Sequence, residues 1–254
     1  MLTLRQITRR ALNELLVTHG VAGPMNHCTP SLLLLLTAVI APFEGAAQGI
    51  VVDQGEFSVT VNNRRWGTEE FTIRRAGIGR DDAIFANAVV QLETGGGQEV
   101  RPLLRAAPPA GIATSYQVEV DGTDALNLQL RLAGQLRYVA IINSGLGEEH
   151  REFPALPDTR VLEQDVAHHY YFLRDAREGR TIPVLEPRTR SRFLLQVGTP
   201  QEEELQLGQR LFETRRVEFS AGEDRRVVWY DRLGRVLRVS VPVRGYLAER
   251  TGVF

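Results

Sequence analysis

Through most of the chain, apolar and polar residues alternate in short runs that turn residues separate. Phe57, Val59 and Val61 share one side of such a run, and the pair Asn62-Asn63 leads into a second apolar series. Alternation on both sides of a compact turn is typical of antiparallel strands with one buried face. The pattern therefore predicts a β-hairpin at this point.

The same alternation recurs toward the C-terminus. Residues 125–132 alternate leucines with polar residues, so one face of the strand meets a core and the other meets water. The run VVWYDRLGRVLRVSVP predicts another hairpin, because Asp231 opens a turn and Gly234 is free to take a positive φ. Strands are predicted at residues 56–62, 83–92, 115–120, 125–132, 135–142, 181–184, 192–197, 203–207, 210–219, 226–231 and 235–241.

The segment RAAPPAG at residues 105–111 interrupts the alternation. Its two adjacent prolines cannot donate to a sheet ladder, so we expect the segment to cross a sheet edge or to connect two sheets. Apolar alternation resumes directly after it with no change of composition. The segment therefore does not indicate a domain boundary.

Residues 162–177 have helical rather than alternating spacing. Val166, Tyr170 and Leu173 recur at intervals of three or four residues, acidic residues come early, arginines come late, and Gly179 follows as a stop. The pattern predicts one helix that covers the sheet.

Together these elements predict a mainly β protein. We expect an antiparallel curved sheet, either an unclosed barrel or a barrel-like sandwich, with one covering helix around residues 162–177. No internal repeat or low-complexity tract divides the alternating part of the chain. We therefore expect a single β-rich domain over residues 48–254.

The N-terminal part has a different pattern. Residues 31–40 read SLLLLLTAVI, and a membrane helix needs about 20 apolar residues, so this run is typical of a secretory signal peptide; a buried helix is the alternative. Met25 offers a second start of the usual signal length, and small residues favour cleavage after Ala47. We expect residues 1–47 to be an extension plus signal peptide, export to the bacterial periplasm or medium, and no transmembrane span in the mature chain.

Composition excludes several functions. The 30 basic and 31 acidic residues nearly cancel, so no global field favours nucleic acid or an anionic membrane. Every basic residue is arginine, which excludes Schiff-base chemistry and a lysine general base. Cys28 precedes the predicted cleavage site, so the mature protein would contain neither thiol nor disulfide.

The strongest candidate for chemistry is the run Asp165-Val166-Ala167-His168-His169. One helical turn separates its carboxylate from the imidazoles, so these groups are spaced to share a metal or a proton. A metal site needs three or four ligands, and His150 is the only other histidine after residue 47. The alternative is that one histidine lies at the core edge and the other faces water. We expect no catalytic residue, metal or cofactor.

Aromatic residues give the one indication of a ligand surface. Six side chains would line one end of a curved sheet whose concave side a helix covers: Trp66, Tyr116, Tyr138, His169, Tyr170 and Tyr171. Most large aromatic side chains fill a core instead, which is the alternative for these six. A small barrel holds one apolar ligand where its interior is not filled by side chains.

Three stretches carry a resemblance: GEFSVTVNNRRWGTEEFTIRR, LEQDVAHHYYFL and DRLGRVLRVSVPVRGYLAER. With the export signal, they resemble a loose group of uncharacterised exported bacterial β-proteins and, more distantly, periplasmic lipoprotein carriers of the LolA and LolB type. The resemblance implies an unclosed barrel with a helical lid, at residues 162–177, over an apolar cavity lined by the leucine faces. No ligand-binding motif of those carriers matches this chain residue by residue.

Three functions remain as hypotheses. The leading one is an exported non-enzymatic envelope protein that binds an apolar small molecule or lipid in the curved sheet. The first alternative is an interaction module with a fully packed sheet, and the second is a hydrolase built on Asp165, His168 and His169. The carrier predicts a connected apolar cavity on the order of several hundred Å³. The module predicts side chains in that space, and the hydrolase predicts a polar cleft with both histidines.

Overall fold

The computed structural model describes residues 49–93, 97–109, 111–122 and 124–252. The predicted signal peptide, with Met25, Cys28 and the cleavage site after Ala47, lies outside these residues, and its prediction is untested. Within the described part, no helix combines the length and the apolar composition needed to cross a bilayer.

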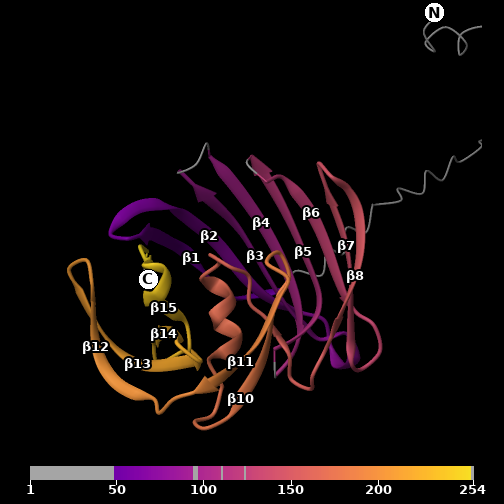
Figure 1. Ribbon diagram of the computed structural model, residues 1–254. Helices are drawn as coiled ribbons and strands as arrows, with labels where there is room; N and C mark the ends of the chain where they lie inside the picture. Colours follow the sequence, from indigo (N-terminus) through magenta and orange to yellow (C-terminus); the bar gives the residue numbers. More distant parts are fainter. Residues whose placement is uncertain (1–48, 94–96, 110, 123, 253–254) are drawn as a thin grey trace, which may run out of the picture. The chain divides into compact units, whose positions relative to one another are not determined.

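Strands dominate the structure and form one mixed sheet (Figure 1). They are β1 (Ile50–Val61), β2 (Arg64–Ala76), β3 (Ala83–Leu92), β4 (Gln98–Ala107), β5 (Ile112–Gly122), β6 (Leu126–Leu132), β7 (Arg137–Ser144), β8 (Gly147–Pro154), β9 (Arg160–Val161), β10 (Thr181–Glu186), β11 (Ser191–Val197), β12 (Gln201–Leu207), β13 (Arg210–Ala221), β14 (Asp224–Tyr230), β15 (Val236–Val241) and β16 (Tyr246–Arg250). Three short 3₁₀-helices, η1 (Gly79–Asp81), η2 (His168–Leu173) and η3 (Pro242–Arg244), accompany them in the described residues.

The sheet follows one long path of neighbours, from β8 back to β1, then β16 to β13, then β11, β10 and β9. All pairs along it are antiparallel except β9 with β10, which is parallel. β12 lies off this path and pairs with β13. The sheet is curved and not closed, because β8 and β9 stand at the two ends of the path (Figure 1). The predicted fold class, a mainly β protein with an unclosed, barrel-like sheet, is confirmed.

Turn chemistry sets the register of the predicted hairpins. Asn62 and Asn63 both adopt positive φ, at 50° and 60°, and bring Val61 opposite Arg64. Such a two-residue turn matches the twist of the flanking strands, and asparagine tolerates it well. The hairpin predicted between β1 and β2 is confirmed.

The prediction for residues 105–111 was wrong. β4 continues to Ala107, and the prolines Pro108 and Pro109 lie in the turn to β5, the next strand of the same sheet. In a turn, the missing N–H groups of proline cost no ladder hydrogen bond. The segment therefore makes a hairpin rather than an edge crossing.

The long helix predicted at residues 162–177 was also wrong in type and extent. Only His168–Leu173 are helical, in a six-residue 3₁₀-helix, and all six side chains are buried. Asp165 adopts a φ of 64°, which interrupts any helix that begins before it. The sheet curls around this helix, so η2 lies within its concave side rather than over it as an amphipathic cover (Figure 1).

One hydrophobic core fills the space between the curved sheet and η2. Inward-facing residues of strands from both halves of the sheet join Val166, Tyr170 and Leu173 in a single cluster. In a second, smaller cluster, Leu205 of β12 packs against Leu237 of β15. Other residues of β15, such as Val236 and Val239, face the main core. The interior of the sheet is therefore packed by side chains of the chain itself.

Candidate functional site

Residues 162–176, called the crossing segment here, run through the concave side of the sheet and are held by Glu69 of β2. The fully buried carboxylate of Glu69 accepts hydrogen bonds from the backbone N–H of Ala167 at 2.6 Å and of His168 at 2.8 Å. It also lies 2.7 Å from Nδ1 of His168. One side chain thus satisfies three polar groups at the start of η2, where free N–H groups need partners.

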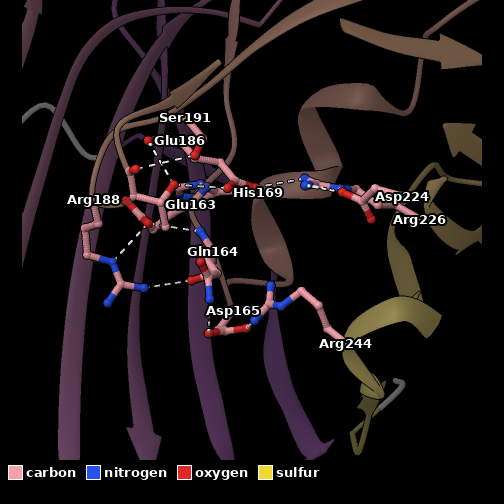
Figure 2. A network of polar contacts seen from close by, with 11 residues as sticks. Glu163, Gln164, Asp165, His169, Glu186, Arg188, Ser191, Asp224, Arg226 and Arg244 are labelled. Carbon is pink, nitrogen blue, oxygen red and sulfur yellow. Dashed lines mark hydrogen bonds and ion pairs between the residues drawn. The ribbon is translucent and has the colours of Figure 1, made fainter. Parts of the chain in front are cut away.

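A second buried carboxylate, Glu163, is the centre of a polar network (Figure 2). It accepts hydrogen bonds from the Tyr116 hydroxyl at 2.8 Å, from Nε of Arg188 at 2.9 Å and from the backbone N–H of Gln164 at 3.0 Å. Burial raises the pKa of Glu163, and the charge of Arg188 opposes that rise. Burial likewise raises the pKa of Tyr116 well above its ordinary value, so its hydroxyl stays a donor.

His169 is a neutral core residue in this network. Its Nδ1 accepts a hydrogen bond from the backbone N–H of Glu163 at 3.0 Å, and its ring packs edge-on against Tyr116. Burial, and then the neighbouring His168 and Arg188, hold the pKa of His169 well below its ordinary value. Nε2 of His168 and of His169 find no hydrogen-bond partner among the described residues.

The cluster expected for a hydrolase does not assemble. The carboxylate of Asp165 pairs with Arg244 of η3, and His169 contacts the backbone of Glu163 (Figure 2). His168 contacts Glu69 instead. Both imidazoles are fully buried, so the expectation that one faces water was wrong. In the described ranges, no group of three or more His, Cys, Asp or Glu residues is placed to hold a metal. Because both imidazoles are buried, neither faces a polar cleft of the kind that a hydrolase requires.

The six aromatic and imidazole residues predicted to bind a ligand occupy different places. Trp66 is partly buried and lines an open groove of about 510 Å³ with Val120, Leu126, Arg188 and Arg244. The other five are buried core residues: Tyr116, Tyr138, His169, Tyr170 and Tyr171. The structure brings Tyr116 and His169 into contact but assembles no common ligand surface from the six, so their ligand-binding role stays a prediction.

Two of the buried tyrosines use their hydroxyls within the protein. Tyr138 donates to the backbone carbonyl of Ala113 at 2.9 Å, and burial raises its pKa to about 12. Tyr116 donates to Glu163, as described above. Buried hydroxyls that are already bonded are core elements rather than ligand contacts.

A different groove combines apolar surface with positive charge. It has a volume of about 550 Å³. Its walls come from the β4–β5 turn, from β9 and the residues before it, from the end of the crossing segment, and from the chain that leads into β10. We call it the arginine groove, and it is lined by Pro109, Gly111, Asp158, Arg160, Phe172, Arg174, Asp175, Ala176, Arg177, Arg180, Thr181 and Ile182.

Sequence reasoning missed both Glu69 and this groove. Glu69 lies on the same inward face of β2 as Phe71 and Ile73. An acidic residue on an otherwise apolar strand face was the sequence signal that could have identified it. No comparable signal marked the groove, because the wall at Pro109 and Gly111 lies far from Phe172 and Ile182 in the chain.

No family model matches this chain, and no curated protein matches it. Among solved structures, it is similar to a beta-barrel-like protein of domain of unknown function DUF1849 from Brucella abortus. The two share 8% sequence identity with a TM-score of 0.47, over 78% of this chain and 93% of that chain. The fold class of the present protein therefore rests on its own strand pairing.

Proposed function

We propose that this chain is an exported non-enzymatic envelope protein that binds an apolar ligand of the lipid class in the arginine groove. The supporting observation is that Phe172 and Ile182, apolar residues of the core, also line an open groove of about 550 Å³. Small-molecule sites usually have volumes of about 300–1,000 Å³ and largely apolar walls. The ligand then binds at one end of the curved sheet, because the crossing segment occupies the interior.

A non-enzymatic role agrees with the chemistry of the buried groups. His168, His169 and Glu163 are buried and bonded within the protein. His168 contacts Glu69, His169 accepts the backbone N–H of Glu163, and the Glu163 carboxylate binds Tyr116 and Arg188, contacts that stabilise the fold. A general acid or base must reach a bound substrate directly or through one water. These three groups are enclosed and do not line the arginine groove.

Native mass spectrometry of the protein purified from a periplasmic fraction tests the proposal. We expect a co-purified lipid, or uptake of a fluorescent fatty acid by the delipidated protein. The substitution Thr181→Trp fills the groove from an exposed position and should reduce uptake at least about tenfold, the equivalent of about 1.4 kcal/mol. Ser144→Trp, exposed at the end of β7, is the control and should bind as the unaltered protein does. A clean apo mass with no fatty-acid uptake would overturn the proposal.

Export is part of the same proposal. The supporting observation is the apolar run at residues 31–40 followed by small residues that end at Ala47. N-terminal sequencing of the secreted form should give a mature chain that begins at Gln48. A mature chain that begins upstream of Ser31 would contradict this processing.

A second candidate function is an interaction module whose packed sheet carries no ligand. The filled interior favours it, since Val166, Tyr170 and Leu173 occupy the space that a barrel-type carrier leaves open. Fatty-acid uptake separates the two candidates. Uptake that Thr181→Trp abolishes excludes the interaction module as the sole function.

A further inference from the structure

We infer that the ligand of the arginine groove is an amphiphile with an anionic oxygen head group, a carboxylate or a phosphate. This inference rests on the proposed function and names the chemical class of its ligand. Four arginines and two aspartates line the groove, an excess of two positive charges in a protein whose net charge is −1. The positive charge is therefore local to this site.

Arg160 is a partly buried arginine of the groove that the backbone holds in place. Its guanidinium donates to two backbone carbonyl oxygens, of Asp158 at 2.7 Å and of Phe172 at 3.4 Å, and forms no ion pair with a carboxylate in the described part of the chain. Burial lowers the pKa of Arg160, and the nearby charge of Asp158 opposes that shift without cancelling it. A partly buried guanidinium that forms no ion pair keeps part of its desolvation cost, and a bound anion would relieve that cost.

Arg177 and Arg180 are the accessible members of the groove. Both side chains are exposed, and neither forms an ion pair or a side-chain hydrogen bond with any residue that the structure describes. Elsewhere many exposed arginines are paired, as Arg137 is with Glu152 and Arg75 with Asp82. Guanidinium groups bind carboxylate and phosphate through two parallel N–H···O bonds, so two unpaired ones suit an oxyanion.

Arg174 completes the groove but is already engaged. Its guanidinium lies 3.7 Å from the centre of the Tyr171 ring and donates to the Tyr171 carbonyl oxygen at 3.0 Å. Its Nε is 3.4 Å from the carboxylate of Asp175. The head group is therefore assigned to Arg160, Arg177 and Arg180.

Apolar contacts are available beside these arginines. Phe172 and Ile182 are at most 8% exposed and still line the groove. Gly111 has a φ of 73°, and a Cβ at that position would lie 3.1 Å from the Phe172 ring, so the turn packs closely on this wall. One groove thus joins a cationic site to an apolar wall, which is the complement of an anionic amphiphile.

Isothermal titration calorimetry with four probes tests the inference on the full mature chain. Dodecanoate and dodecyl phosphate carry an anionic head, glycerol monododecanoate carries a neutral head on a similar tail, and inorganic phosphate carries no tail. We expect both anionic amphiphiles to bind at least about tenfold more tightly than the neutral one, the difference that one charge-assisted contact provides. Inorganic phosphate should bind more weakly than dodecyl phosphate.

Variants assign the head group to the three arginines. Arg177→Gln with Arg180→Gln should weaken dodecanoate binding about tenfold or more and leave glycerol monododecanoate binding unchanged. Arg160→Gln should act in the same direction. The control pair Arg64→Gln with Arg131→Gln removes two charges from β2 and β6, outside the groove, and should change neither affinity. The exposed side chains of Arg177 and Arg180 form no ion pair or hydrogen bond in the described part of the chain, so that pair keeps the test valid if Arg160→Gln fails to fold.

The outcomes separate this inference from the function it rests on. If the amphiphiles bind regardless of head group and the arginine variants have no effect, the head-group assignment is wrong and the apolar site stands. If inorganic phosphate binds as tightly as dodecyl phosphate, the groove is an anion site and the apolar proposal is wrong. If no probe binds, both are overturned.

Discussion

Glu69 of β2 and His168 of η2 are in direct contact, with 2.7 Å between a carboxylate oxygen and Nδ1, although 99 residues separate them in the chain. Both side chains are fully buried. The same carboxylate binds the N–H groups of Ala167 and His168. This contact joins the β1–β2 hairpin to the crossing segment, so each of the two depends on the other for its correct position.

Removing this carboxylate should destabilise the whole domain. Glu69→Ala is expected to lower the free energy of unfolding by about 3–5 kcal/mol, because it leaves three buried polar groups without their partner. Glu70→Ala is the matched control, since the neighbouring side chain is exposed, and it should change the free energy by less than about 0.5 kcal/mol. Urea unfolding measures both, and equal effects at the two positions would refute the role given to Glu69.

A second buried pair fixes the last strand against the first. Two nitrogens of the Arg250 guanidinium donate to the two carboxylate oxygens of Asp53, at 2.7 Å and 3.2 Å, and both side chains are 2% exposed. Arg250→Gln should cost about 3–5 kcal/mol of stability, since a buried carboxylate would lose its counter-charge. Arg238→Gln breaks the more exposed pair with Glu249 and should cost less than about 1 kcal/mol. Thermal unfolding measures both variants, and a larger loss of stability in Arg238→Gln than in Arg250→Gln would contradict the prediction.

Acidification should destabilise the protein through His169. Burial holds the pKa of His169 well below its ordinary value, so the folded state keeps it neutral while the unfolded chain takes up a proton near pH 6.5. The unfolded state then binds more protons, and the free energy of unfolding falls as pH drops below about 6.5, by at most about 1.4 kcal/mol per pH unit from this group.

The substitution His169→Asn isolates that contribution. Its amide oxygen can still accept the backbone N–H of Glu163, but asparagine does not titrate. We expect a lower stability overall and a weaker decline between pH 6.5 and pH 5 in urea unfolding. His150→Asn, which alters an exposed histidine on β8, is the control and should retain the full decline. An unchanged decline in His169→Asn would contradict the prediction.

The buried hydroxyls of Tyr116 and Tyr138 should differ in their effect on stability. Tyr116→Phe removes a donor from the buried carboxylate of Glu163, which should cost about 1.5–3 kcal/mol. Tyr138→Phe removes a bond to the neutral carbonyl of Ala113, and the expected cost is about 1 kcal/mol. Chemical denaturation of both variants tests the order, and a larger loss in Tyr138→Phe would contradict the central place of Glu163.

Several elements followed from local pattern. The hairpin at Asn62-Asn63 was predictable because two consecutive residues with positive φ need side chains that tolerate it. The turn at Asp231 is similar, since its carboxylate accepts the N–H groups of Leu233 and Arg235, and Gly234 takes a φ of 75°. In both cases the decisive interactions lie within a few residues, so the sequence contains them directly.

The crossing segment shows where local pattern misleads. The spacing of Val166, Tyr170 and Leu173 is helical, yet the segment forms only one six-residue 3₁₀-helix. Its conformation depends on Glu69 of β2 and Arg188 of the β10–β11 turn, which bind its N–H and carbonyl groups. An isolated amphipathic helix would expose one polar face to water. All six side chains of η2 are buried instead, because the sheet surrounds this helix.

By itself, the sequence determined the alternating strands, the compact turns, the mainly β class and the absence of lysine chemistry, because each depends on residue type and short spacing. Only the tertiary structure decided that the sheet curls around residues 162–176 and that the histidines pair with Glu69 and Glu163. It also decided that Arg160, Arg177 and Arg180 share a groove with Phe172 and Ile182. Glu69 and His168 are far apart in the chain, so the path of the whole sheet decides that they meet.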